Sequence, residues 1–422
     1  MDRRTSIKSL IASFPLLSPV HAAAGASRPR VAFIGCGGRA KGLYDGFREY
    51  SDVRWVCDPD GTRLQEFKSR TKAEYDSNDM RRALDDSQVD AVVIATPDHW
   101  HAPAALLALA AGKHVYVEKP CSHNLVEGQQ LVQGARKTGL RVQHGTQSRT
   151  SPMIAGAIQM LREGLIGEVI SAKAWNVQRR RDIGKAVPTE PPPGVDYETW
   201  IGPAEYVPYQ KNRFHYDWHW WYNFGTGDIG NDGAHEMDMA RWGLGVKDLP
   251  TKVMALGGKY FFNDEQQFPD TATCVFEWSN SNSRTKQLVF EMRLWSKNYP
   301  HNCDSGVEFY GTQGMMFVSK RGKLQVWNDS NQLLVDPRPQ RMPQLPANHQ
   351  VDFLQAIEQS RPPAAEIAEG NASVALIHLA NISVRLGQSI ALDGAGNIVD
   401  NPNALALASR SYREHWGTPL QA

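Results

Sequence analysis

Residues 31–40 of this 422-residue chain read Val-Ala-Phe-Ile-Gly-Cys-Gly-Gly-Arg-Ala, and this stretch decides the fold. The first four residues are typical of a buried strand, and a helical pattern follows the glycines as far as Tyr50. Gly35, Gly37 and Ala40 have the spacing G-x-G-x-x-A, in which the first glycine allows a tight turn and the second lets backbone approach a pyrophosphate. The small third residue lets the helix pack on the strand, and the phosphates would lie at the helix N-terminus. The stretch therefore predicts a dinucleotide-binding turn.

A second apolar run, residues 53–57, supports this prediction because it ends in an acid. That acid, Asp58, lies about 20 residues beyond the glycines, where a carboxylate can accept both hydroxyls of a ribose. Asp58 and Asp60 would repel a 2′-phosphate, so the sequence favours NAD over NADP as the cofactor, while Arg63 keeps NADP as an alternative. An ordinary turn after a strand is the other interpretation of residues 58–60, and the glycine motif before it argues against that.

Strand-like apolar runs go on alternating with helical patterns as far as residue 143. Such alternation predicts a parallel, doubly wound sheet, whose ligands bind beyond the carboxyl ends of the strands. The expected strands are 89–95, 114–117 and 140–143, and the expected helices are 102–111 and 125–137. The strand ends that should face the ligand are Thr96-Pro97-Asp98-His99-Trp100-His101, Glu118-Lys119-Pro120 and His144-Gly145-Thr146-Gln147.

The composition is that of a folded protein without strong charge. Apolar residues make up 41% and charged residues 22%, and 46 Lys and Arg balance 45 Asp and Glu to a net charge of +1. This balance argues against nucleic acid or an anionic membrane as the main partner, and no apolar run approaches the roughly 20 residues that cross a bilayer. The five cysteines are scattered without a C-x-x-C pair, so we expect no metal site and no disulfide framework.

The N-terminus has the layout of a secretory signal. Arg3-Arg4 and a basic start precede a modest apolar stretch at 10–20 and small residues at 22–24. The paired arginines resemble a twin-arginine signal, which predicts export to the periplasm in the folded state. A basic N-terminus on a cytoplasmic protein is the alternative.

Beyond Thr150 the pattern changes to that of an α+β domain. A helix is expected at 153–163, and several later runs alternate apolar and polar residues, as in an open, mainly antiparallel sheet with one wet face. The proline-rich residues 188–194 predict a stiff surface loop. The expected strands are 169–177, 252–262, 271–278, 287–296, 307–310 and 315–319.

The densest chemical feature is the segment 213–228, which reads Arg-Phe-His-Tyr-Asp-Trp-His-Trp-Trp-Tyr-Asn-Phe-Gly-Thr-Gly-Asp. Sugars present C–H faces that pack on aromatic rings and hydroxyls that need polar partners, so this mixture predicts a carbohydrate pocket. About half of the tryptophans should instead pack in the core. Our candidates for sugar contact are Trp220 and Tyr222. The run Arg179-Arg180-Arg181 could bind an acidic substrate, although a solvated charge run is the more ordinary interpretation.

Glu118-Lys119-Pro120, together with the glycine motif and Thr96-Pro97, resembles the glucose–fructose oxidoreductase/inositol dehydrogenase family, also called Gfo/Idh/MocA. The resemblance continues through Gly145-Thr146-Gln147, Gly233-Ala234-His235 followed by Asp238, and a helical segment at 349–386. It implies an N-terminal Rossmann domain and a C-terminal α+β domain whose open sheet carries a homo-oligomer contact. We therefore divide the chain into a signal segment (1–27), an NAD-binding domain (28–148) and a substrate-binding and oligomerisation domain (149–422).

The resemblance also implies roles for single residues. Lys119 would lie near the nicotinamide and hydrogen-bond the reacting hydroxyl, and His235 would be the general base, which suits an ammonium and a neutral imidazole. Without the resemblance, a surface lysine and a core histidine are the ordinary interpretations of these two residues. The residues expected to contact the cofactor are Gly35, Gly37, Gly38, Arg39, Asp58, Thr96, Pro97, His101, Glu118, Lys119 and Gln147.

The chain departs from the family pattern at Asn231. The family usually has an aspartate there, four residues before the histidine, and an asparagine cannot carry a proton. The base role then falls to His235 alone or with help from Asp228 or Asp232. We expect the substrate to contact Asn231 and Asp232 as well as the two aromatic residues named above.

These features predict an NAD-dependent oxidoreductase that takes hydride from a secondary hydroxyl of a sugar, glycoside or polyol onto tightly bound cofactor. The alternative is a redox-neutral glycosidase that oxidises the sugar, eliminates the aglycone, adds water and reduces the ketone again, as some relatives do. That route needs a second base, for which Tyr222, His219 and Asp232 are candidates. A non-catalytic sugar-binding protein is the less favoured third possibility.

Overall fold

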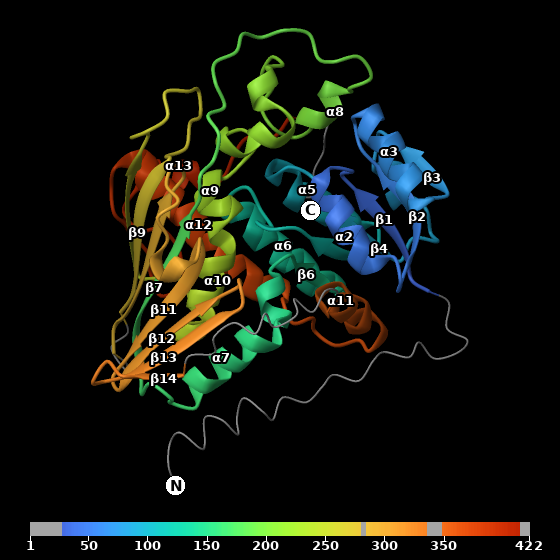
Figure 1. The fold of residues 1–422 in the computed structure, drawn as a ribbon. Coiled ribbons are helices and arrows are strands. Elements are labelled where there is room, and N and C mark those ends of the chain that lie inside the picture. Colours follow the sequence, from blue (N-terminus) through green and yellow to red (C-terminus); the bar gives the residue numbers. More distant parts are fainter. Residues whose placement is uncertain (1–27, 280–283, 336–347, 414–422) are drawn as a thin grey trace.

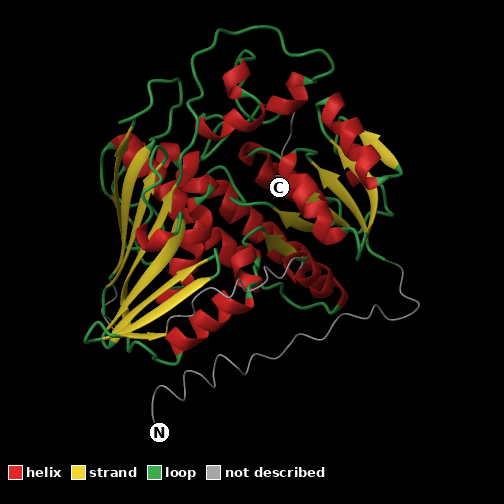
Figure 2. Cartoon of the chain, in the orientation of Figure 1, coloured by secondary structure: helices red, strands yellow, loops and turns green. Residues whose placement is uncertain are grey.

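The computed structural model describes residues 28–279, 284–335 and 348–413. Two sheets stand at opposite sides of the molecule, with helices packed between and around them (Figures 1 and 2). The signal-like segment, residues 1–27, lies outside the described residues. Across the described part, no helix combines the length and the apolar character that a membrane span requires.

The first sheet has six parallel strands in the order β3-β2-β1-β4-β5-β6. Its central strands are buried on both faces, which is why they read as short continuous apolar runs rather than as alternating ones. The predicted doubly wound sheet is therefore confirmed. The strands are β1 (Arg30–Ile34), β2 (Asp52–Cys57), β3 (Tyr75–Ser77), β4 (Ala91–Ile94), β5 (His114–Val117) and β6 (Val142–His144).

The helix after β4 begins earlier than predicted. Pro97 is its extended N-cap and Asp98 places an acid in its first turn, so the helix starts at Asp98 rather than at Ala102. The strand-end segment around His101 is thus helical. The helices of this half are α2 (Gly38–Phe47), α3 (Gly61–Thr71), α4 (Arg81–Leu84), α5 (Asp98–Ala110) and α6 (Leu125–Thr138), followed by the 3-10 turn η1 (Gln147–Thr150).

The second sheet has nine strands in the order β14-β13-β12-β11-β7-β10-β9-β8-β15. Only β7 and β10 pair in parallel, and the other described neighbours pair antiparallel, so the prediction of an open, mainly antiparallel sheet is confirmed. The strands are β7 (Val169–Val177), β8 (Lys252–Gly258), β9 (Thr271–Trp278), β10 (Lys286–Arg293), β11 (Ser305–Gly311), β12 (Gly314–Ser319), β13 (Lys323–Asn328), β14 (Leu333–Val335) and β15 (Ile390–Ala391).

Helices cover the inner face of this sheet and leave its outer face open (Figure 1). On β8, for example, Val253 and Ala255 are buried while Met254 and Leu256 are exposed. The remaining helices are α7 (Pro152–Arg162), α8 (Tyr197–Ile201), α9 (Gly227–Asn231), α10 (Gly233–Leu244), α11 (Asn348–Glu358), α12 (Ile367–Leu386) and α13 (Pro402–Leu407), with 3-10 turns η2 (Lys211–Arg213), η3 (His215–Trp220) and η4 (Pro300–Asn302).

Residues 178–226, which we call the strap, leave the second sheet after β7, pass over the N-terminal domain and return to α9 (Figure 1). The strap has a small aromatic core of its own, so most of its tryptophans stabilise the strap itself. Its core residues are Ile183, Tyr197, Trp200, Ile201, Ala204, Tyr209, Phe214, Trp220, Trp221 and Phe224.

Candidate active site

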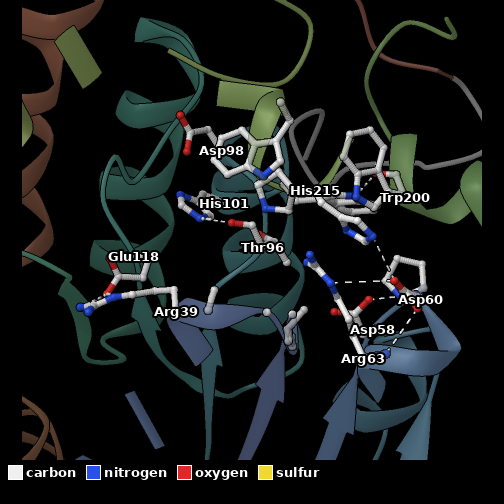
Figure 3. A pocket seen from close by; sticks show the side chains of 18 of the residues that line it. Arg39, Asp58, Asp60, Arg63, Thr96, Asp98, His101, Glu118, Trp200 and His215 are labelled. Carbon is white, nitrogen blue, oxygen red and sulfur yellow. Dashed lines mark hydrogen bonds and ion pairs between the residues drawn. The ribbon is translucent and has the colours of Figure 1, made fainter. Parts of the chain in front are cut away.

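A cavity of about 470 Å³ lies between the carboxyl ends of the parallel strands and the strap (Figure 3). Ten of the eleven residues predicted to contact the cofactor line it, and Gln147 does not, because its amide lies behind Glu118 at 3.5 Å from that carboxylate. The ten lining residues are Gly35, Gly37, Gly38, Arg39, Asp58, Thr96, Pro97, His101, Glu118 and Lys119.

The glycine turn at the floor of the cavity fits a pyrophosphate. Gly35 has φ +88°, and a Cβ there would lie 2.7 Å from the carbonyl oxygen of Ala95, so only glycine is accommodated. Gly37 is the N-cap of α2 and offers no side chain to the first amides of that helix. These N–H groups are therefore available to a phosphate, which the helix dipole also attracts.

The carboxylates at the end of β2 fit the ribose of an adenosine. Asp58 is buried and accepts hydrogen bonds from the amides of Cys36, at 2.7 Å, and Asp60, at 2.8 Å. Burial raises its pKa above the ordinary value, although the two amides and Arg63 oppose that shift. Asp58 retains free lone pairs toward the cavity, because a carboxylate accepts more than two hydrogen bonds. The acid predicted to select NAD thus lies where that role requires it.

The opposite wall carries an ion pair between the buried Glu118 and the exposed Arg39. Glu118 accepts hydrogen bonds from Arg39 at 2.6 and 2.7 Å, and the arginine lowers its pKa even though burial acts in the other direction. The hydroxyl oxygen of Thr96 is buried with no partner among the described residues, which leaves it free for a ligand. The cavity therefore has a carboxylate for the adenosine ribose, free amides for the pyrophosphate and polar side chains on the opposite wall, and these residues suit NAD.

Lys119 reaches from the first domain to the second. Its ammonium donates to the backbone oxygen of Asn231 and, at 3.0 Å, to the Oδ1 atom of the same residue. The Asn231 amide donates in turn to Asp228 at 3.2 Å. Because an ammonium has three N–H groups, Lys119 keeps one donor for a substrate oxygen. Asn231 lines the cavity as predicted and takes the place of a carboxylate partner for the lysine.

His235 lies on the first turn of α10 and is not among the residues that line the cavity, whereas Asn231, four residues earlier, is. Its imidazole makes no hydrogen bond within the described chain. Burial lowers its pKa well below the ordinary value, and the nearby charges of Lys320 and Lys119 lower it further. The ring is therefore neutral at pH 7 and able to accept a proton.

Asp228 and Asp232 are both engaged by Arg180. Asp228 is fully buried and accepts from Arg180 at 2.8 Å, while Asp232 accepts from Arg180 and from Gln178. Burial would raise the pKa of Asp232, but Arg180 and then Lys320 and Lys119 lower it overall. Neither carboxylate bonds Lys119. Arg180 is thus a largely buried cation paired with two carboxylates, which the sequence run of three arginines did not indicate.

The two aromatic residues predicted to bind sugar do not line the cavity. Trp220 is 1% exposed, and its indole N–H donates to Asp228 at 2.8 Å. Tyr222 donates its hydroxyl to the Gln267 carbonyl, and its ring lies against Arg385. Trp220 is held by a nearby residue of the chain, and Tyr222 is held by contacts from distant parts of it. The strap residues that line the cavity are Thr199, Trp200, His215, Tyr216, Trp218 and His219.

The strap is fastened to the rim of the N-terminal domain beside the predicted adenosine end. His215 lies 3.3 Å from the Asp60 carboxylate (Figure 3). The Gly61 amide donates to the Gly194 carbonyl at 3.0 Å. Asp196 donates its amide to the carbonyl of Pro59 at 2.9 Å. These contacts cover the cavity from the side of the second domain.

Sequence comparison confirms the resemblance drawn from the motifs. Residues 29–146 match the family model described as an oxidoreductase family with an NAD-binding Rossmann fold, and residues 173–418 match that of its C-terminal alpha/beta domain. The chain belongs to the Gfo/Idh/MocA oxidoreductase family. NAD binding is thus the family property of the domain that carries the glycine turn.

Two curated relatives are 29% identical over 166 residues: a glycosyl hydrolase family 109 protein of Shewanella pealeana and an alpha-N-acetylgalactosaminidase of Shewanella oneidensis. Each match covers 36% of this chain and 36% of the relative, so it spans about a third of either protein.

Solved structures share the fold over most of the chain. Levoglucosan dehydrogenase, in complex with NADH and L-sorbose, is 19% identical with a TM-score of 0.68, covering 87% of this chain and 99% of that one. An aldose-aldose oxidoreductase from Caulobacter crescentus, complexed with glycerol, is 18% identical with a TM-score of 0.66, covering 86% and 100%. At 18–19% sequence identity, the similarity to these structures shows a shared fold and nothing more.

Proposed function

We propose that this family member oxidises a secondary hydroxyl of a carbohydrate with NAD. The observation that carries the proposal is the position of Lys119, whose ammonium crosses from the cofactor cavity to Asn231, the last residue of α9 and four residues before His235 on α10. When bound, NAD would supply the hydride acceptor. The sugar dehydrogenase neighbours in structure support a carbohydrate as the substrate class.

Two side chains would share the work on the hydroxyl. The remaining N–H of Lys119 would hold the substrate oxygen and stabilise the negative charge that develops on it. The neutral imidazole of His235 would take the hydroxyl proton. Asn231 would keep the ammonium in place without titrating, and Asp228 and Asp232 would stay paired with Arg180, so the proton pathway begins at His235 alone.

A Lys119 variant tests the role of the ammonium. Purified protein is denatured to identify any released nucleotide, and the absorbance of reduced nicotinamide is then followed as sugars and polyols are added to the intact protein. We expect Lys119→Met to lower kcat by about 100-fold or more, because general acid–base and electrostatic groups contribute effects of that order. Its bound nucleotide should remain. Full turnover in Lys119→Met would contradict the proposal.

A redox-neutral glycosidase is the second candidate function, and two observations favour it. The curated relatives carry the names of glycosidases, and the strap is fastened over the cavity as a cofactor reused in place would require. Of the three predicted second bases, only His219 lines the cavity; Tyr222 and Asp232 do not. Tyr216 lines it as well. Release of an aryl aglycone without accumulation of NADH would select this function, and an accumulating keto-sugar would exclude it.

We also propose that the chain acts after export and as a homo-oligomer. The arginine pair at residues 3–4 supports export to the periplasm, with a cytoplasmic location as the alternative. The exposed Met254 and Leu256, 61% and 74% accessible on the outer face of the second sheet, support a contact between copies there. Light scattering of the protein with Met254→Lys and Leu256→Lys should then show a monomer where the native protein is larger.

A further inference from the structure

A second concave site lies beyond the carboxyl ends of strands β7 and β10, outside the cofactor cavity. We call it the outer hollow, and its lining includes Arg179, Arg180, Arg181, Phe261, Trp295 and Lys297. Backbone contacts join its walls. Arg179 and Trp295 form an isolated antiparallel β-bridge, and the Arg180 amide donates to the Leu294 carbonyl at 2.7 Å. The hollow is therefore a fixed part of the second domain.

The outer hollow carries cations that the protein does not neutralise. The exposed side chains of Arg179 and Lys297 make no hydrogen bond or ion pair with any described residue. Arg181 pairs with Asp217 but remains 70% exposed. Asp182 is the one acid among the residues that line the hollow, and its carboxylate accepts a hydrogen bond from the Gly184 amide at 2.5 Å. In a chain with a net charge of +1, this local excess of positive charge favours an anionic ligand.

The hollow also presents a flat aromatic surface. Phe261 is 62% exposed and Trp295 is 37% exposed, and their rings stack with centroids 5.6 Å apart at 19°. Trp295 is fixed in this position because its indole N–H donates to Thr271 at 2.8 Å. A preorganised exposed ring beside cations suits the C–H face of a sugar that carries an acidic group. A site for a simple anion would need only the cations, so the exposed rings favour a ligand that also has an apolar face.

One side chain joins the hollow to the candidate active site. Arg180 lines the hollow, pairs with Asp228 and Asp232, and donates to the hydroxyl of Tyr216, which lines the cofactor cavity. We infer that the outer hollow binds an acidic sugar unit, a uronate or a sulfated sugar, linked to the sugar that is oxidised. The part of this inference that concerns the linked substrate rests on the proposed function; binding of the acidic unit does not.

Direct binding of glucuronate tests the inference, with glucose and acetate as comparison ligands, by calorimetric titration of the full chain. We expect glucuronate to bind about tenfold more tightly than either ligand, and the double variant Arg179→Gln, Lys297→Gln to weaken it about tenfold, as the loss of two exposed charge contacts implies. A matched control, Arg136→Gln with Lys137→Gln, removes two exposed cations from α6 and should leave binding unchanged. Phe261→Ser should weaken the binding of glucuronate but not the binding of acetate.

The readouts separate this inference from the proposed oxidation. Lys119→Met should lower kcat by about 100-fold or more and keep glucuronate binding intact. Absence of glucuronate binding, equal binding of acetate, or unchanged binding in the Arg179, Lys297 double variant would overturn the acidic-sugar site, whatever the outcome for hydride transfer.

Discussion

Replacing Trp220 by phenylalanine separates two roles for this side chain, a sugar platform and a structural donor. The structure assigns the second role, because the ring is 1% exposed and its N–H bonds the Asp228 carboxylate at 2.8 Å. Asp228 is itself fully buried and shares Arg180 with Asp232. Phenylalanine keeps the aromatic packing but leaves this buried carboxylate short of one donor.

The expected cost follows from that lost bond. A hydrogen bond to a charged group contributes about 1.5–3 kcal/mol, and the smaller ring leaves a cavity that adds about 1 kcal/mol. We therefore expect Trp220→Phe to lower the free energy of urea unfolding by about 3 kcal/mol. The KM for the sugar should change little, because the ring does not line the cavity.

Trp218→Phe is the matched control. Trp218 lines the cavity and stacks on His219 with ring centroids 3.6 Å apart, so its replacement should alter ligand binding more than stability. Unfolding in urea, followed by circular dichroism, and steady-state kinetics are measured on both variants. An unchanged stability with a raised KM in Trp220→Phe would refute the structural assignment.

Three further predictions follow from the site. Gly35→Ala should purify without nucleotide, because its Cβ would meet the Ala95 oxygen at 2.7 Å; nucleotide content of the denatured protein measures this, and a full complement would contradict it. His235→Gln should retain nucleotide yet lower kcat by about 100-fold, and a variant whose pH–rate profile matched the native one would exclude His235 as the base. Burial raises the pKa of Asp98 to about 7, so the folded protein holds this proton more tightly than the unfolded chain does. The stability of the native protein relative to that of Asp98→Asn should therefore fall as the pH rises from about 4 to 7, and then level off. A constant difference between their urea midpoints across this range would contradict the prediction.

The N-terminal fold was predictable because its signals are local. Each buried parallel strand is a short apolar run, and the glycine turn combines a positive φ with a close backbone contact that few residue types allow. The start of α5 was mispredicted because residues 96–101 were taken as a strand end that faces the ligand, whereas Pro97 is the N-cap and the helix begins at Asp98. The fold class and the cofactor cradle thus followed from short segments.

The substrate side of the site was less predictable because its contacts are distant in sequence. Arg180 looks like one of three equal arginines until the fold brings it against Asp228 and Asp232. Trp220 lies only eight residues before Asp228, yet the sequence alone does not show that its indole bonds this carboxylate rather than a ligand. Lys320, which pairs with buried Glu236 at 2.8 Å and acts on His235, stands in a turn with no motif around it. No local pattern indicates such pairings.

The strap belongs to the same domain that supplies His235, and it ties that domain to both ends of the cofactor cavity. The Asp60–His215 and Gly61–Gly194 contacts hold the strap on one rim, and the Lys119–Asn231 contact joins the two domains at the other end. We therefore expect a nucleotide in the cavity to be released slowly, because its departure past the strap would require the contacts on that rim to open.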